Sequence, residues 1–250
     1  FAVTVINYLD RQTLAALAPQ LKDHFGWSNE DYGYVVNAFQ IAYTIMQTIT
    51  GRLLDILGTR TGIALSVTFY SIAGILTAFS RGLFSFSAFR LLLGLGEAAN
   101  NPGGSKAVSE WFPARERTAA VALFNSGCAV GGMLAPFIVF YIYEYFGDWR
   151  IPFVLTGVLG FLWLGIWLKF YRSPAQHPNL SAAELAYIEA GRMPPVAGGK
   201  RIKWLDVLSY RQAWGLILGR FLLDPFWFLI TNWFPIYLMS KGFDMKASVL

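Results

Sequence analysis

The stretch GRLLDILGTR, residues 51–60, joins two apolar segments that are each long enough to cross a lipid bilayer as an α-helix. Gly51 lets neighbouring helices approach closely, and Gly58 allows a tight turn between them. Asp55 can cap a helix end or form an ion pair, and Arg60 supplies a cation of the kind found on the cytosolic side of membranes. The stretch therefore predicts two adjacent membrane-spanning helices, although a generic helix-ending turn would have the same features.

The composition of the whole 250-residue chain is that of a membrane protein. Hydrophobic residues make up 55%, aromatic residues 17% and charged residues 14% of it, whereas about a quarter of the residues in a soluble domain are charged. The formal net charge of +5 fits basic loops on one side of a membrane and not a nucleic-acid partner. We therefore expect an all-α membrane protein whose first partner is the lipid bilayer.

Residue types needed for several kinds of chemistry are scarce. Cys128 is the only cysteine, which excludes an intramolecular disulfide and a cysteine-based metal site. The two histidines, His24 and His177, fall in polar connectors, and no nucleophile–His–acid set or metal-ligand cluster is recognisable. We therefore expect neither an enzyme nor a bound metal or organic cofactor.

Seven segments have the length and apolar character of membrane spans. They cover residues 1–18, 32–55, 61–80, 83–105, 118–146, 151–171 and 213–240. We expect a six-helix bundle at 1–171, a polar linker at 172–212 with a short helix at 181–191, and the first helix of a second bundle with the start of the next helix at 213–250. Because the chain starts inside an apolar segment without Met and stops in FDMKASVL, we expect both ends to be truncations.

Lysine and arginine counts orient the segments. Of the 20 Lys and Arg residues, 12 fall in or beside one set of alternate connectors, 5 in the opposite set and 3 within the predicted spans. The set of connectors with 12 basic residues includes the 172–212 linker. Because basic residues collect on the cytoplasmic side, we expect the N-terminus and this linker in the cytoplasm.

Charged residues within the predicted spans point to a site. A charged side chain near a bilayer centre costs about 2.5–3.5 kcal/mol on insertion scales, yet INYLDRQTL (6–14) carries Asp10 and Arg11. Consecutive helical residues point about 100° apart, so Asp10 can face a neighbouring helix while Arg11 faces a pore.

In RLLLGLGEAANNPGG (90–104), Arg90 and Glu97 share one helical face. The alternative explanation for the charged residues in these two spans is that they form structural ion pairs between helices.

A third ionisable set lies in the seventh predicted span. Arg220 and Asp224 are four residues apart and could simply neutralise each other. However, ionisable sets then recur in the first, fourth and seventh spans. We expect these three helices to line a central cavity.

Several motifs together resemble a known family of transporters. GRLLDILGTR resembles the signature loop G-x-x-x-D-(R/K)-x-G-x-(R/K) of the major facilitator superfamily, with Ile56 in place of the usual base. RLLLGLGEA (90–98) resembles the family's fourth-helix motif R-x-x-x-G-x-G-(E). With NYLDR (7–11), SEWFPARERTAAVALFNSG (109–127) and DWRIPFVLTGVLGFLW (148–163), the resemblance extends over all 250 residues. Within the superfamily, the chain most resembles bacterial hexuronate permeases of the anion:cation symporter branch.

This resemblance implies proton-coupled symport of a sugar acid, a hexuronate such as galacturonate or glucuronate, by alternating access. In this branch the residues matching Asp10 and Glu97 carry protons. Those matching Arg11 and Arg90 serve the anionic substrate and keep the carboxylates ionised. Tyr43 matches a tyrosine that contacts substrate. The coupling ion would be the proton, and the expected carrier is a monomer in the inner (plasma) membrane.

Other residues are weaker candidates of the same kind. Tyr8 and Gln47 could also reach the substrate. For them, as for Tyr43, a hydrogen-bonded position between helices is a nearly equal explanation. Asn125 could reach the substrate too, but an interhelical hydrogen bond is the better explanation for it. Arg220 and Asp224 would be a cavity pair contributed by the second half. The gating loop would comprise Gly51, Asp55, Gly58 and Arg60.

Other functions remain open at this stage. The substrate could be another organic anion, such as galactonate, glucarate or an aromatic carboxylate. A membrane sensor could keep the same fold without moving substrate, and its charged pairs would then be structural. An intramembrane enzyme is disfavoured because no nucleophile–base pair or metal set is present in the apolar segments.

Overall fold

The computed structural model describes residues 1–191 and 204–242. Within this part of the chain the elements are helices, with no strand, so the predicted all-α class is confirmed. Residues 192–203 of the predicted linker lie outside the described residues. So do residues 243–250, where the start of a further helix was predicted.

Eight α-helices make up the part predicted as the first bundle. They are α1 (Ala2–Ala16), α2 (Ala18–Phe25), α3 (Asn29–Leu57), α4 (Thr59–Thr77), α5 (Leu83–Glu97), α6 (Asn100–Trp111), α7 (Arg117–Phe146) and α8 (Arg150–Phe170). A short 3-10 turn, η1 (Pro174–Gln176), then precedes α9 (Ala182–Ala190), α10 (Trp204–Val207) and α11 (Arg211–Ser240).

The fourth predicted span, 83–105, is divided into α5 and α6 by an interruption at Ala98–Ala99, just before Pro102. The first predicted span, 1–18, is essentially α1. It ends at Leu17, and α2 begins beyond it with Pro19, which has no N–H to continue the ladder. By length and composition alone, three described helices are long and apolar enough to cross a membrane: α7, α8 and α11. The helices α1 and α5 have only 15 residues each.

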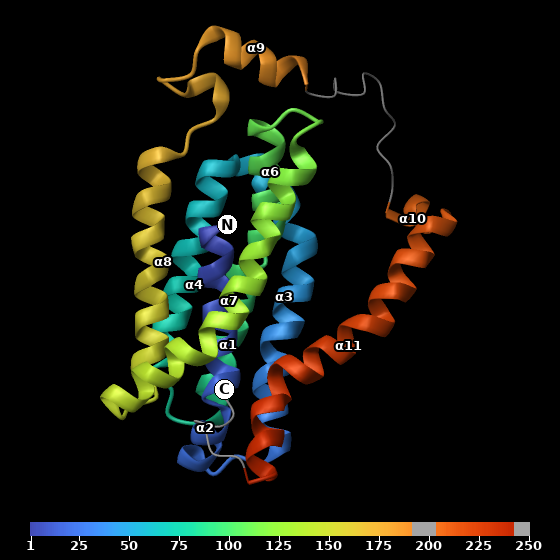
Figure 1. Ribbon diagram of the computed structural model, residues 1–250. Coiled ribbons are helices and arrows are strands. Elements are labelled where there is room, and N and C mark those ends of the chain that lie inside the picture. The colour runs from blue at the N-terminus through green and yellow to red at the C-terminus, as the bar shows by residue number, and fades with distance from the viewer. Residues whose placement is uncertain (192–203, 243–250) are drawn as a thin grey trace.

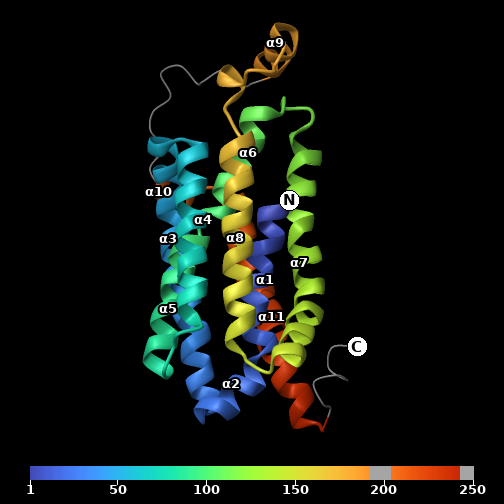
Figure 2. The same cartoon turned by 90° about the vertical axis from the view of Figure 1, so that its left-hand side faces the viewer.

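The helices α1 to α8 form an elongated bundle in which most axes run close to one direction (Figures 1 and 2). The main packing pairs are α1 with α7, α3 with α5, and α4 with both α5 and α8. Small residues allow these close crossings. A Cβ added to Gly131 of α7 would lie 2.7 Å from the carbonyl oxygen of Val5 on α1.

Gly131 and its neighbour provide a matched test of this crossing. We expect Gly131→Ala to lower the free energy of unfolding by about 1–3 kcal/mol, because the added methyl group overpacks the α1–α7 contact. Gly132→Ala is the control, since a Cβ there meets nothing within 4 Å. It should be neutral or stabilising, because Ala is the better helix former. Thermal unfolding in detergent measures both, and equal midpoints for the two variants would contradict the assigned contact.

The helix α11 meets the bundle only along part of its length. In Figure 1 its C-terminal half lies against the bundle, and its N-terminal half leans away from it. Tyr32 of α3 donates a hydrogen bond to the carbonyl oxygen of Asn232 at 3.1 Å, and its ring meets Trp233 edge-on at 5.2 Å. Prolines 225 and 235 lie inside α11, where each removes a backbone hydrogen bond.

The predicted short helix of the linker is present as α9, at the end of the bundle opposite α2 (Figure 1). The Ser181 side chain caps it by accepting a hydrogen bond from the Glu184 N–H at 3.1 Å. Tyr187 of α9 donates to Glu116, in the α6–α7 connector, at 2.8 Å, and this bond raises the pKa of Tyr187. The linker helix is therefore docked on the bundle.

Candidate functional site

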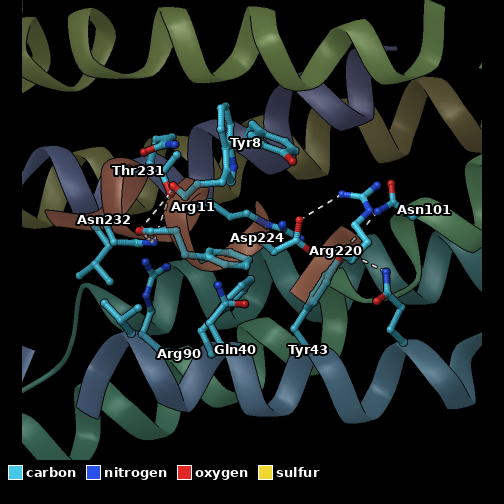
Figure 3. A pocket seen from close by; sticks show the side chains of 17 residues that line it. Tyr8, Arg11, Gln40, Tyr43, Arg90, Asn101, Arg220, Asp224, Thr231 and Asn232 are labelled. Atoms are coloured by element: carbon cyan, nitrogen blue, oxygen red, sulfur yellow. Dashed lines mark hydrogen bonds and ion pairs between the residues drawn. The ribbon is translucent and has the colours of Figure 1, made fainter. Parts of the chain in front are cut away.

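A cavity of about 460 Å³ lies between the bundle and α11, within the size range of small-molecule sites. Figure 3 shows its lining side chains. From α1 to α6 these are Tyr8, Arg11, Gln12, Leu14, Val36, Phe39, Gln40, Tyr43, Gln47, Arg90 and Asn101. From α11 they are Arg220, Asp224, Trp227, Phe228, Thr231 and Asn232.

Arg11 is the best-defined cation of the cavity. Its Nε donates a hydrogen bond to Glu97 Oε2 at 2.6 Å, and the Glu97 side chain is completely buried. The guanidinium carbon lies 4.4 Å from the centre of the Tyr43 ring and 5.2 Å from that of Phe39. The aromatic faces and the carboxylate hold the guanidinium in place, while its other N–H groups remain donors for a ligand.

Arg90 supplies a second guanidinium from α5. Its carbon lies 5.8 Å from the centre of the Phe39 ring, so one aromatic side chain contacts both arginines of the bundle. Arg90 is 3% exposed, and its Nε has no hydrogen-bond partner among the described residues. A buried donor of this kind is costly unless something satisfies it.

The predicted pair on α11 faces these arginines across the cavity. Arg220 Nη1 lies 3.2 Å from Asp224 Oδ1, and both side chains are largely exposed. The cavity wall therefore carries Arg11, Arg90 and Arg220 against the single carboxylate of Asp224, while Glu97 lies behind Arg11. This excess of positive charge suits an anionic ligand.

Neutral polar groups complete the wall. The Tyr43 hydroxyl accepts hydrogen bonds from Gln47 Nε2 and Asn101 Nδ2, each at 3.4 Å (Figure 3). Tyr8, Tyr43 and Gln47, all predicted as candidates, therefore line the cavity. Hydroxyl and amide groups of this kind can bind the hydroxyl groups of a polar ligand.

Sequence reasoning missed several lining residues. They are Gln12, Gln40, Asn101, Thr231 and Asn232. The helical period would have found some of them, because Asn101 follows Glu97 by four residues, and Thr231 and Asn232 follow Asp224 by seven and eight. Such spacing selects a face of a helix but does not tell which helix that face meets.

Asp10 lies away from the cavity, inside the bundle. It is 3% exposed, and a Cβ on Gly74 of α4 would lie 3.9 Å from its Oδ1 and 3.9 Å from the Cα of Gly157 on α8. Asp10 therefore occupies the place where α1, α4 and α8 meet. Adjacent residues of α1 thus face different surroundings, as the predicted 100° separation requires.

Asn125 does not line this cavity, and its contact with substrate stays a prediction. It is exposed on α7 and absent from the lining. The reason is the rotation of α7, which turns Gly127 and Gly131 toward the backbone of α1. Asn125 is two residues before Gly127, so it points to a different side of the helix.

The predicted gating loop forms a polar network at the end of the bundle that carries α9. Gly58 connects α3 to α4 with φ 75°, a value that favours glycine. Asp55 forms an ion pair with Lys106 of α6 at 2.6 Å, and Arg60 Nη2 donates to the carbonyl oxygen of Leu168 on α8 at 2.5 Å. The loop therefore connects α3 and α4 to both α6 and α8.

Comparison of the sequence with those of known proteins identifies its family. The family description Major Facilitator Superfamily matches residues 1–250. A galacturonate transporter of Dickeya chrysanthemi is 38% identical over 97% of this chain and 71% of its own length. A hexuronate transporter of Escherichia coli (strain K12) is 37% identical over 97% of this chain and 57% of its own. A D-galactonate transporter of Escherichia coli O6:H1 is 34% identical over the whole chain and 60% of its own length.

Solved structures show the same fold. A bacterial homolog of the human lysosomal transporter Spinster, in an inward-facing and unoccupied conformation, superposes with a TM-score of 0.76 at 18% identity, covering 99% of this chain and 56% of that one. Its inward-facing and occupied form gives a TM-score of 0.73 at 19% identity, with 99% and 54% covered. The chain thus spans little more than half the length of these structures, and the names found are those of transporters and not of enzymes.

Proposed function

The chain belongs to the major facilitator superfamily, and we propose that it is a secondary active transporter that imports a sugar acid together with protons by alternating access. The proposed substrates are hexuronates such as galacturonate and glucuronate, the substrates named for two of its relatives. The observation that carries the proposal is the ion pair between Arg11, at the wall of a cavity that Arg90 also lines, and the fully buried Glu97.

The two arginines fit the recognition of a carboxylate. A substrate carboxylate that enters a desolvated cavity needs a fixed cation, and the planar fork of arginine matches both of its oxygens. Arg11 is already oriented by Tyr43 and Phe39, so little side-chain entropy is lost when it binds. Tyr8, Tyr43 and Gln47 are proposed partners for the sugar hydroxyl groups.

We infer coupling to protons because Arg11 would be the ion-pair partner of both the substrate carboxylate and Glu97. If a substrate carboxylate draws Arg11 away, Glu97 is left as an uncompensated charge in a fully buried position. Such a charge is strongly unfavourable, and proton uptake neutralises it. Substrate binding would therefore favour protonation of Glu97, and Asp10 would be the second proton carrier.

The remaining parts of the proposal concern location and gating. The protein would lie in the inner (plasma) membrane as a monomeric, multi-pass carrier with its N-terminus and the 172–212 linker in the cytoplasm. Gly51, Asp55, Gly58 and Arg60 would gate the cytoplasmic end, and Arg220 with Asp224 would contribute to the cavity from the second half. The proton is the only coupling ion proposed.

A competitive uptake panel tests this function. With the full-length protein in proteoliposomes, we expect saturable uptake of labelled galacturonate that rises when the outside is made more acidic than the inside. Unlabelled glucuronate should compete better than galactonate. Stronger competition by galactonate would favour the second candidate, an aldonate carrier like the 34%-identical relative. Binding without any pH-dependent uptake would contradict transport and favour a sensor.

A further inference from the structure

The interruption between α5 and α6 lies between two polar residues of the site. Glu97 is the last residue of α5 and Asn101 is the second residue of α6, with Ala98–Ala99 between the two helices. Glu97 forms the ion pair with Arg11 at 2.6 Å. Asn101 donates to the Tyr43 hydroxyl at 3.4 Å. The path of the chain through the interruption therefore determines where both side chains lie.

Pro102 leaves the carbonyl oxygen of Ala98 without its helical donor. In an α-helix this oxygen accepts from the N–H four residues later, and proline has no N–H. The buried Thr50 hydroxyl of α3 donates to it at 3.3 Å. The same hydroxyl lies 3.0 Å and 3.2 Å from the carbonyl oxygens of Met46 and Gln47, but these belong to the continuous helix α3 and have helical N–H donors of their own. Ala98 is therefore the acceptor for which Thr50 replaces a missing bond.

The carbonyl oxygen just before Glu97 is bonded from another helix. Ser66 of α4 donates to the carbonyl oxygen of Gly96 at 2.7 Å. The two helices are in close contact here, because a Cβ added to Gly96 would lie 2.8 Å from the Cβ of Tyr70 on α4. Hydroxyl groups from α3 and α4 thus bond to the residues directly before and directly after the completely buried Glu97.

We propose that Thr50 and Ser66 are positioning residues for Glu97, an inference that rests on the coupling role proposed for it. Neither hydroxyl residue lines the cavity, so neither is a candidate for contact with substrate. Their hydrogen bonds fix the backbone on both sides of Glu97, which keeps its Oε2 within hydrogen-bonding distance of Arg11 Nε. Loss of either bond lets the interruption relax, and the guanidinium that faces the cavity then loses its orienting partner.

Removal of the Thr50 hydroxyl tests the bond to Ala98. In the full-length protein, Thr50→Val keeps the shape of the side chain and removes the donor. We expect the KM for galacturonate exchange in proteoliposomes to rise about fivefold, because Arg11 is less well oriented, while the maximal rate stays within about twofold of wild type. Thr50→Ser keeps a hydroxyl and should bring the KM to within about twofold of wild type. Ser66→Ala should raise the KM as Thr50→Val does.

Two further variants separate positioning from packing. Pro102→Ala supplies a backbone N–H four residues after Ala98, so in the Thr50→Val background it should lower the KM again toward the wild-type value. Thr77→Val is the matched control, since Thr77 is also buried and its hydroxyl donates to the carbonyl oxygen of Ala73 in its own helix at 2.9 Å. It should leave the KM unchanged. Equal increases in Thr50→Val and Thr77→Val, or no recovery with Pro102→Ala, would overturn the role of Thr50.

An infrared readout needs no substrate and so separates this inference from the proposed function. The band of the Glu97 side chain, identified by its loss in Glu97→Gln, should shift in Thr50→Val and Ser66→Ala but not in Thr77→Val. An unchanged Glu97 band in Thr50→Val and Ser66→Ala would overturn the positioning role even if transport fell. A wild-type protein that exchanges no sugar acid would instead overturn the proposed function, and the infrared comparison would still decide whether the two hydroxyl groups position Glu97.

Discussion

Arg11→Gln is expected to abolish recognition of the sugar acid, lowering its affinity about 100-fold or more. Truncating one partner of a buried, hydrogen-bonded charge pair typically costs about 2–5 kcal/mol, and each 1.4 kcal/mol is a factor of ten in affinity. The charge pair concerned is the one proposed between Arg11, which lines the cavity, and the substrate carboxylate. Gln cannot supply the forked, charged donor that a carboxylate needs.

Two further substitutions define which property of Arg11 matters. Arg11→Lys keeps the charge but loses the planar fork and much of the stacking on Tyr43, so an intermediate loss is expected. Arg220→Gln is the matched control within the same cavity. Because the Arg220 side chain is 77% exposed, its loss should reduce affinity by less than about tenfold.

Binding is measured by titrating galacturonate into the purified protein, with ligand-induced thermal stabilisation as a second readout. Each variant's own unfolding midpoint shows whether it is folded. If folded Arg11→Gln binds galacturonate within about threefold of wild type, that is within about 0.7 kcal/mol, Arg11 is not the anion site. Equal losses for Arg11→Gln and Arg220→Gln would point to general electrostatic attraction instead.

The helical period explains which parts of the site could be read from the sequence. Arg90 and Glu97 are seven residues apart, so they share a face of α5, and both are buried in the bundle. Asp10 and Arg11 are adjacent, so they must diverge, and one is inside the bundle while the other lines the cavity. Local spacing also predicted the Arg220–Asp224 ion pair.

The sequence does not reveal how each helix is rotated about its axis relative to its neighbours. The rotation of α7 is set by the contacts of Gly127 and Gly131 with α1, and the apolar residues around all sides of α7 do not indicate it. The sequence therefore did not indicate which way Asn125 points. Likewise, Asn101 meets Tyr43 across 58 positions of sequence, a contact that depends on how α6 continues after the interruption at Ala98–Ala99.

Glu97→Gln is expected to remove proton-driven accumulation while retaining substrate exchange. Gln has nearly the shape of a protonated Glu, but it cannot release or take up a proton. Its carbonyl oxygen can still accept a hydrogen bond from Arg11, so the arginine keeps an orienting partner at the position where Glu97 Oε2 lies 2.6 Å from Nε. The variant should therefore bind galacturonate and carry it in both directions without coupling.

The measurement compares two rates in the same proteoliposomes. Uptake driven by an inward proton gradient should fall to the level of liposomes without protein, whereas exchange of labelled for unlabelled galacturonate should stay within about threefold of wild type. Glu110→Gln is the matched control, because Glu110 accepts hydrogen bonds from Thr59 and Tyr171 at the gating-loop end of the bundle, outside the cavity. This control should keep its coupling. Undiminished accumulation by Glu97→Gln would show that the proton is carried elsewhere, and Asp10→Asn in the same assay would then show whether Asp10 alone carries it.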